Sequence, residues 1–187
     1  MQRDLEFIRI NEKLLGRACE VMALAERKDL SIVTAESCSG GLLAAVLSEA
    51  PGASEHLHGG FVTYTKTQKT AALGVPSELL ARCGAVCGEV AATMAEGALA
   101  RSPADIAIAI TGVAGPTPDE DGNPVGLMDF AVARRGFATL RVERSFGAIG
   151  RTEAQCRALE QALDLLSDAM MREEPASLPR QMFSTRP

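Results

Sequence analysis

Segments with strand and helix patterns alternate along this chain of 187 residues, and that alternation limits its possible folds more than any other feature. Helical periodicity is clearest over 89–100 and 151–171, where apolar residues recur every three or four positions. Between these helices, 105–111 is a continuous apolar run typical of a buried strand. In chain order we expect helix 6–27, strand 31–34, helix 40–48, strand 61–65, one or two helical turns over 66–73, helices 77–82 and 89–100, strands 105–111, 126–134 and 138–145, and helix 151–171.

This order predicts an α/β fold in which helices cover both faces of one sheet. The last three strands follow one another without a helix between them, so their hairpins are antiparallel and the sheet is mixed. Residues 172–187 contain three prolines and no periodicity. We therefore expect one folded domain over 1–171, followed by a tail or an arm over a neighbouring molecule over 172–187.

The composition excludes several classes of protein. Apolar residues make up 47% and charged residues 23% of the chain, which argues against intrinsic disorder. A net charge of −5 and only 4% aromatic residues provide neither a basic surface nor stacking platforms for nucleic acid. The uncharged runs are shorter than the ~18 residues that span a bilayer, and the charged N-terminus is not a secretory signal. We expect a soluble cytoplasmic protein without nucleic-acid or membrane partners.

The cysteines and acidic residues do not predict a metal site. Five scattered cysteines do not form a disulfide framework, and no second pair of Cys or His joins Cys83 and Cys87 in a zinc set. The acidic run 119–123 superficially resembles a calcium loop, but its glycine is misplaced and its twelfth position is Phe130. We expect packed thiols, a solvated acidic loop and no bound metal.

Two segments follow predicted strands, where ligands bind in sheets of this kind. In the segment Thr34 to Gly41, two serine hydroxyls and two glycines stand before a helix, which favours an anion or oxyanion pocket; the alternative is an ordinary capped helix start. The segment 64–69 holds the only tyrosine and two of the four lysines. Tyr64 and Lys69 are candidates for a general acid and base beside a serine, provided that burial or a nearby cation keeps the amine neutral. The alternative is a solvated helix start.

A third segment, Thr111 to Pro116, follows the most apolar strand. Its Gly-x-x-Gly turn can present N–H groups to a carbonyl or a phosphate. The alternative is a tight exit from a buried strand. Arg151 stands at the start of the last helix, where acids are usual, and a cation at that position suits an arriving phosphate.

Together these segments resemble the C-terminal domain of the CinA family, the family of nicotinamide mononucleotide deamidases. The run Thr34-Ala-Glu-Ser-Cys-Ser-Gly-Gly41 is similar to the TAESCTGG signature of that family. The resemblance covers about residues 10–171 and leaves out the tail. Further matches in the same order are Pro51-Gly-Ala-Ser54, Gly60-Phe-Val-Thr-Tyr64, Leu73-Gly-Val75, Gly84-Ala-Val86, Ile110-Thr-Gly-Val-Ala-Gly-Pro116 and Pro124-Val-Gly126.

The resemblance implies a three-layer α/β/α domain with a mixed five-stranded sheet, in agreement with the order of elements. It implies hydrolysis of the carboxamide of nicotinamide mononucleotide to nicotinate mononucleotide and ammonia, in pyridine-nucleotide salvage. It implies no metal or other cofactor, a small-molecule nucleotide as substrate, and a homo-oligomer.

Amide hydrolysis needs a nucleophile, a proton donor for the departing ammonia and hydrogen-bond donors for the oxyanion. Within the resemblance we assign Ser37 as the nucleophile and Tyr64 with Lys69 as the acid–base pair. Ser39, Gly40 and Gly41 are assigned to contacts with the oxyanion or phosphate, and Arg151 to bidentate contact with phosphate. Thr111, Gly112 and Gly115 are assigned to the lining of the nucleotide. The residues assigned to substrate binding are Glu36, Ser39, Gly40, Gly41, Lys66, Thr111, Gly112, Gly115 and Arg151.

Four positions depart from the family pattern. Lys66 stands where Asn is usual, and this added cation is expected either to lower the pKa of Lys69 or to disturb the pocket. Cys87 and Gly88 replace Ser-Glu, Asn123 replaces a Lys, and Ala148 replaces an acid. These changes leave two alternatives open. One is a nucleotide-binding or interaction protein that has lost turnover. The other is an amidase that acts on another nucleotide or small amide.

Overall fold

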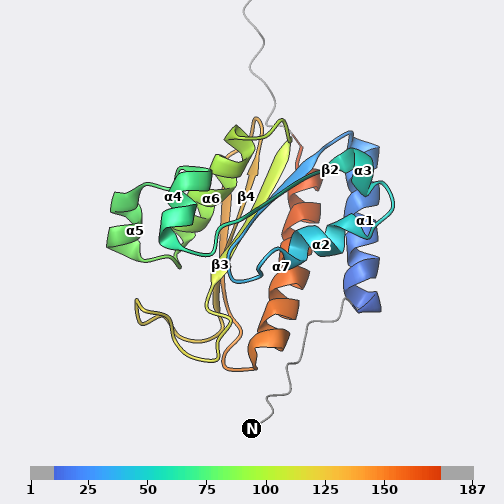
Figure 1. Cartoon of the computed structure of the whole chain (residues 1–187). Coiled ribbons are helices and arrows are strands. Elements are labelled where there is room, and N and C mark those ends of the chain that lie inside the picture. Colours follow the sequence, from blue (N-terminus) through green and yellow to red (C-terminus); the bar gives the residue numbers. More distant parts are fainter. Residues whose placement is uncertain (1–10, 174–187) are drawn as a thin grey trace, which may run out of the picture.

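The computed structural model of this chain describes residues 11–173 (Figure 1). Most predicted elements are present, and the last helix has the predicted bounds. In chain order the elements are α1 (Glu12–Lys28), β1 (Ile32–Glu36), α2 (Leu42–Ser48), α3 (Ala53–His56), β2 (Leu57–Val62), α4 (Lys66–Leu73), α5 (Ser77–Cys83), α6 (Gly88–Ala100), β3 (Ile106–Gly112), β4 (Leu127–Arg134), β5 (Leu140–Ser145) and α7 (Arg151–Met171).

Within the described residues the five strands form one sheet in the order β2-β1-β3-β4-β5. β1 pairs in parallel with both β2 and β3, whereas β4 is antiparallel to β3 and to β5. The predicted mixed sheet is therefore confirmed. Because β1, β2 and β3 are parallel, their carboxyl ends meet at one edge of the sheet, and the segments that follow them lie together there.

Helices cover both faces of the sheet, as the three-layer prediction required (Figure 1). The alternation within β3 shows how the faces differ. Ile106, Ile108 and Ile110 pack with α1, α2 and α7 in one core, while Ala107 and Ala109 pack against α6 in the other. Large side chains fill the first layer, and small ones let α6 approach closely.

Two elements differ from the sequence prediction. β2 begins at Leu57 rather than Phe61, because pairing with β1 makes a strand of residues with weak strand propensity, including Gly59 and Gly60. The short helix α3 was not predicted. α1 begins after Asn11, whose side chain accepts a hydrogen bond from the Leu14 N–H, and the predicted start of this helix lies outside the described residues. The predicted tail also lies outside them, apart from its first two residues.

None of the helices in residues 11–173 is long and apolar enough to cross a membrane. The five cysteines are free thiols, and all but Cys38 are partly exposed. Cys38 is buried at the edge of the sheet where β1, β2 and β3 end, beside the candidate site.

Candidate active site

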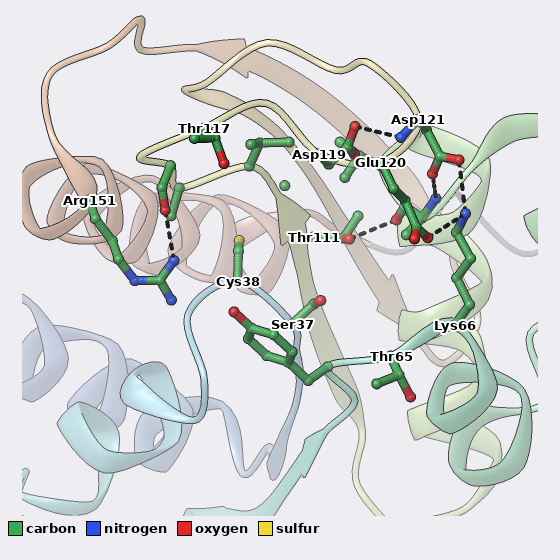
Figure 2. Close-up of a pocket in the computed structure, with 17 residues that line it drawn as sticks. Ser37, Cys38, Thr65, Lys66, Thr111, Thr117, Asp119, Glu120, Asp121 and Arg151 are labelled. Atoms are coloured by element: carbon green, nitrogen blue, oxygen red, sulfur yellow. Dashed lines mark hydrogen bonds and ion pairs between the residues drawn. The ribbon is translucent and has the colours of Figure 1, made fainter.

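A cavity of about 470 Å³ opens where the parallel strands end. The turn after β1, the segment before α4, the loop after β3 and the first residue of α7 form its walls (Figure 2). It brings together seven predicted site residues: Ser37, Tyr64, Lys66, Thr111, Gly112, Gly115 and Arg151. Cys38 and the acidic residues 119–121 also line the cavity, although they were not predicted to do so.

Backbone hydrogen bonds hold Ser37 at the cavity. Its N–H donates to the Ile110 carbonyl of β3 at 2.9 Å, and its own carbonyl accepts from the Gly40 N–H at 3.0 Å. From α7, the Gln155 side-chain amide donates to the Cys38 carbonyl at 2.8 Å. The serine thus sits on a turn fixed by two neighbouring elements, which is the preorganisation that a nucleophile requires.

The neighbouring thiol is not an alternative nucleophile at neutral pH. Burial raises the pKa of Cys38 to about 12, so the thiol stays protonated. Its sulfur contacts the Met128 sulfur at 3.4 Å in the core. Thr111 also lines the cavity, but its hydroxyl donates to the Ala85 carbonyl at 2.8 Å.

Lys69 lies behind the cavity and does not line it. The side chain is fully buried, and its amine donates to the Thr63 carbonyl at 2.7 Å. Burial lowers the pKa of Lys69 to about 8, and Lys69 and Cys38 each influence the pKa of the other. Lys66 is not among the causes of the shift. The expectation that the added cation lowers the pKa of Lys69 is therefore wrong, because desolvation alone lowers it.

Lys66 faces the acidic loop. Its amine lies 2.8 Å from the Glu120 carboxylate and 2.8 Å from the Asp121 carboxylate. These hydrogen bonds raise the pKa of Lys66, so it remains a cation. The prediction that 119–123 is simply a solvated loop is thus incomplete: Asp119 and Asn123 are half-buried, and the exposed Glu120 and Asp121 are paired with Lys66 of α4.

Four predicted binding residues do not line the cavity: Glu36, Ser39, Gly40 and Gly41. The Glu36 carboxylate is fully buried and accepts from the N–H groups of Gly41, Leu43 and Ala44 at 2.9–3.1 Å. It also accepts from the Thr34 hydroxyl at 3.0 Å. Glu36 caps α2, because Gly41 at the N-cap position has no side chain to do so.

This capping changes the interpretation of the turn as a substrate cradle. The N–H of Gly40 donates to the Ser37 carbonyl and that of Gly41 to Glu36, so neither is left for an oxyanion or a phosphate. The Ser39 hydroxyl is buried and has no hydrogen-bond partner among residues 11–173. Sequence reasoning did not anticipate that Glu36 and the Ser37 carbonyl would accept the N–H groups of Gly41 and Gly40.

Opposite charges stand at opposite ends of the cavity. Arg151, exposed at the start of α7, lines one end and donates to the Gly115 carbonyl at 3.1 Å. Glu120, Asp121 and Lys66 stand at the other end, with Ser37 and Cys38 between (Figure 2). A molecule with an anion at one end and a cation at the other complements this arrangement.

Two of the remaining departures from the family pattern, Cys87 and Asn123, have structural roles. The Cys87 sulfur accepts from the Val90 N–H at 3.5 Å, so it takes the N-cap position of α6 in place of a hydroxyl. The Asn123 amide donates to Asp119 at 2.8 Å inside the acidic loop. Ala148 is exposed just before α7.

Comparison with known proteins matches this chain and its fold to one family. A family model described as the CinA C-terminal domain matches residues 16–170. The chain belongs to the CinA C-terminal domain family. A CinA-like protein of Akkermansia muciniphila is 44% identical over 151 residues, which cover 81% of this chain and 36% of that protein. A putative competence-damage inducible protein of Symbiobacterium thermophilum is 51% identical over 113 residues, 60% of this chain and 26% of that protein. This CinA domain thus spans about a third or less of these relatives.

Solved CinA structures agree over nearly their whole length. The competence/damage inducible protein of Agrobacterium tumefaciens superposes with a TM-score of 0.82 at 40% identity, covering 87% of this chain and 98% of that one. A CinA superfamily protein of Escherichia coli gives 0.79 at 33% identity, covering 89% and 98%. The α/β fold is therefore that of the CinA domain.

Proposed function

We propose that this CinA domain hydrolyses the carboxamide of nicotinamide mononucleotide, with Ser37 as the nucleophile. The observation that carries the proposal is the position of Ser37, held in a cavity with a cation at one end and acids at the other. Nicotinamide mononucleotide has a phosphate at one end and a positively charged pyridinium ring at the other. Its phosphate would lie at Arg151 and its ring toward the acidic loop.

Ser37 attacks the carboxamide carbon and passes its proton to a base. Lys69 is the proposed base, since a pKa near 8 leaves part of its population neutral at physiological pH. Tyr64, at the cavity rim, is proposed to assist proton transfer to the departing ammonia. The tetrahedral adduct then collapses to a serine ester and ammonia, and water hydrolyses the ester to nicotinate mononucleotide.

Ammonia release from nicotinamide mononucleotide tests this proposal. We expect turnover by the wild type and a loss of roughly 10³-fold or more in Ser37→Ala. Cys38→Ala is the matched control, because it changes the adjacent side chain, whose protonated thiol has no proposed role. An inactive wild type, or an active Ser37→Ala, would refute the assignment. A panel of other nucleotide amides shows whether the substrate differs.

One observation favours a second function, nucleotide binding without turnover. The N–H groups of Gly40 and Gly41 already have internal acceptors, so they do not provide a preformed oxyanion hole. Calorimetry with nicotinamide mononucleotide separates the two functions. Tight binding without ammonia release would support the second, and absence of binding would count against both.

A further inference from the structure

Lys66 connects three segments around the cavity. It is the first residue of α4, and its amine contacts Glu120 and Asp121 of the loop between β3 and β4. Asp121 in turn accepts a hydrogen bond from the Ala85 N–H at 3.2 Å, in the segment between α5 and α6. Ala85, Glu120, Asp121 and Lys66 all line the cavity, so this cluster forms one of its ends.

Ion pairs and hydrogen bonds, rather than apolar packing, hold the tip of the loop between β3 and β4, residues 117–121. Three consecutive acids, Asp119 to Asp121, repel one another unless they are paired. Asp119 accepts from the N–H groups of Asp121 and Asn123 and so shapes the loop internally. Thr117, Pro118 and Glu120 are exposed, which leaves little apolar packing to hold the tip in place. Lys66 pairs with two adjacent carboxylates at once, which reduces their mutual repulsion, and they hold its pKa above the ordinary value.

A second hollow lies on the other side of this contact. It has a volume of about 520 Å³ between α4 and α5 and is lined by Thr67, Ser77 and Leu80 among others. Lys66 and Asp121 line both hollows. Their ion pair is therefore part of the wall between the cavity that holds Ser37 and the space beyond it.

We propose that Lys66 is a positioning residue for the nucleotide site. By pairing with Glu120 and Asp121 it fixes the acidic loop as the wall that closes one end of the cavity. The inference rests on the proposed function insofar as the occupant of the cavity is a mononucleotide. Lys66 is not assigned to the reacting atoms, so its loss should weaken substrate binding more than it slows the chemical step.

Amide hydrogen exchange tests the loop without any ligand. In Lys66→Met, exchange at Ala85 and at Asn123 should become about tenfold faster, because both N–H groups bond to the fastened loop. Lys66→Arg keeps the cation and should stay near the wild-type rate. Lys13→Met is the matched control: it breaks an ion pair of 2.7 Å with Glu160, between α1 and α7, and should leave these amides unchanged.

Kinetics with nicotinamide mononucleotide supply the second measurement. Lys66→Met should raise KM about tenfold with kcat within about threefold, and Lys66→Arg should restore KM. Unchanged exchange in Lys66→Met would overturn the inference, even if KM rose, because a direct substrate contact would then explain the effect. Faster exchange with unchanged KM would also overturn it. The wild type could neither bind nor turn over the nucleotide while amide exchange in Lys66→Met still becomes faster. In that case the proposed function is refuted, but the conclusion that Lys66 holds the acidic loop in place is supported.

Discussion

Replacing Asp129 by asparagine should remove a pH-dependent loss of stability. This carboxylate on β4 is 2% exposed, and its Oδ2 has no hydrogen-bond partner among residues 11–173. Its other oxygen faces the start of α6, where a Cβ added at Gly88 would lie 3.5 Å away. Burial first, and the nearby Glu143 second, raise the pKa of Asp129 to about 6 from an ordinary 3.8.

The magnitude follows from the two pKa values. Below pH 3.8 the carboxyl is protonated in both the folded and the unfolded chain. Between pH 3.8 and about 6 the unfolded chain gives up the proton while the folded chain retains it, so the free energy of unfolding falls as pH rises. About two pKa units, at roughly 1.4 kcal/mol each, make a loss of about 3 kcal/mol that is complete above the folded-state pKa.

Urea unfolding of the wild type and Asp129→Asn from about pH 4 to 7.5 measures this loss. The asparagine side chain is neutral throughout, so the stability difference between the proteins should grow by about 2.5 kcal/mol across this range, because a small part of the loss has already occurred at pH 4. Any constant cost of the new amide group cancels in that comparison. Glu143→Gln removes the second cause of the shift and should make the step smaller.

A stability difference that stays constant with pH to within about 0.5 kcal/mol would refute the reasoning. It would mean that the Asp129 carboxylate ionises in the folded chain as readily as in the unfolded one. A hydrogen-bond donor or access to solvent would then offset the effect of burial and of Glu143 on the pKa of Asp129.

Three further outcomes follow from the site. Glu36→Gln, which replaces the capping carboxylate of α2, should lower the free energy of unfolding by about 3 kcal/mol in urea melts, and an effect below about 0.5 kcal/mol would contradict the capping role. If Lys69 is the base, kcat/KM should rise with pH to a plateau above the pKa of about 8; a flat profile would exclude it, and Lys69→Met should abolish the rise. Arg151→Met should raise KM for the mononucleotide roughly 10–100-fold, whereas Arg157→Met, which breaks a surface pair with Glu153 on the same helix, should not.

The fold was largely predictable because its elements have strong local patterns. The Ile-Ala alternation of β3 and the apolar repeat of α7 identify both elements without tertiary information. β2 was misplaced for a tertiary reason. At Gly60 a Cβ would overlap the Thr34 hydroxyl of β1, so the glycine is required by close packing between strands. In the sequence alone the same glycine indicates a break.

The sequence predicts which residues line the site where the ends of the strands determine their position. It does not predict the residues whose position depends on the direction of the side chain. Ser37 and Thr111 reach one cavity because parallel strands end at the same edge of the sheet. Glu36 does not, because alternation along β1 turns it toward α2, on the same face as Ile32 and Thr34. The sequence did contain a signal for the capping role of Glu36. A helix that starts at Gly41 has no side chain at its N-cap, so its first N–H groups need a hydrogen-bond acceptor from another part of the chain.

Lys66 and Lys69 show most clearly what only three-dimensional structure decides. They lie three residues apart at the start of one short helix, and either could be assigned as the basic amine from sequence. Burial lowers the pKa of Lys69, whereas two carboxylates 55 residues or so along the chain raise that of Lys66. The surroundings therefore shift the pKa values of two identical side chains in opposite directions. Lys69 can exchange a proton near neutral pH, and Lys66 keeps its charge to hold the wall of the cavity.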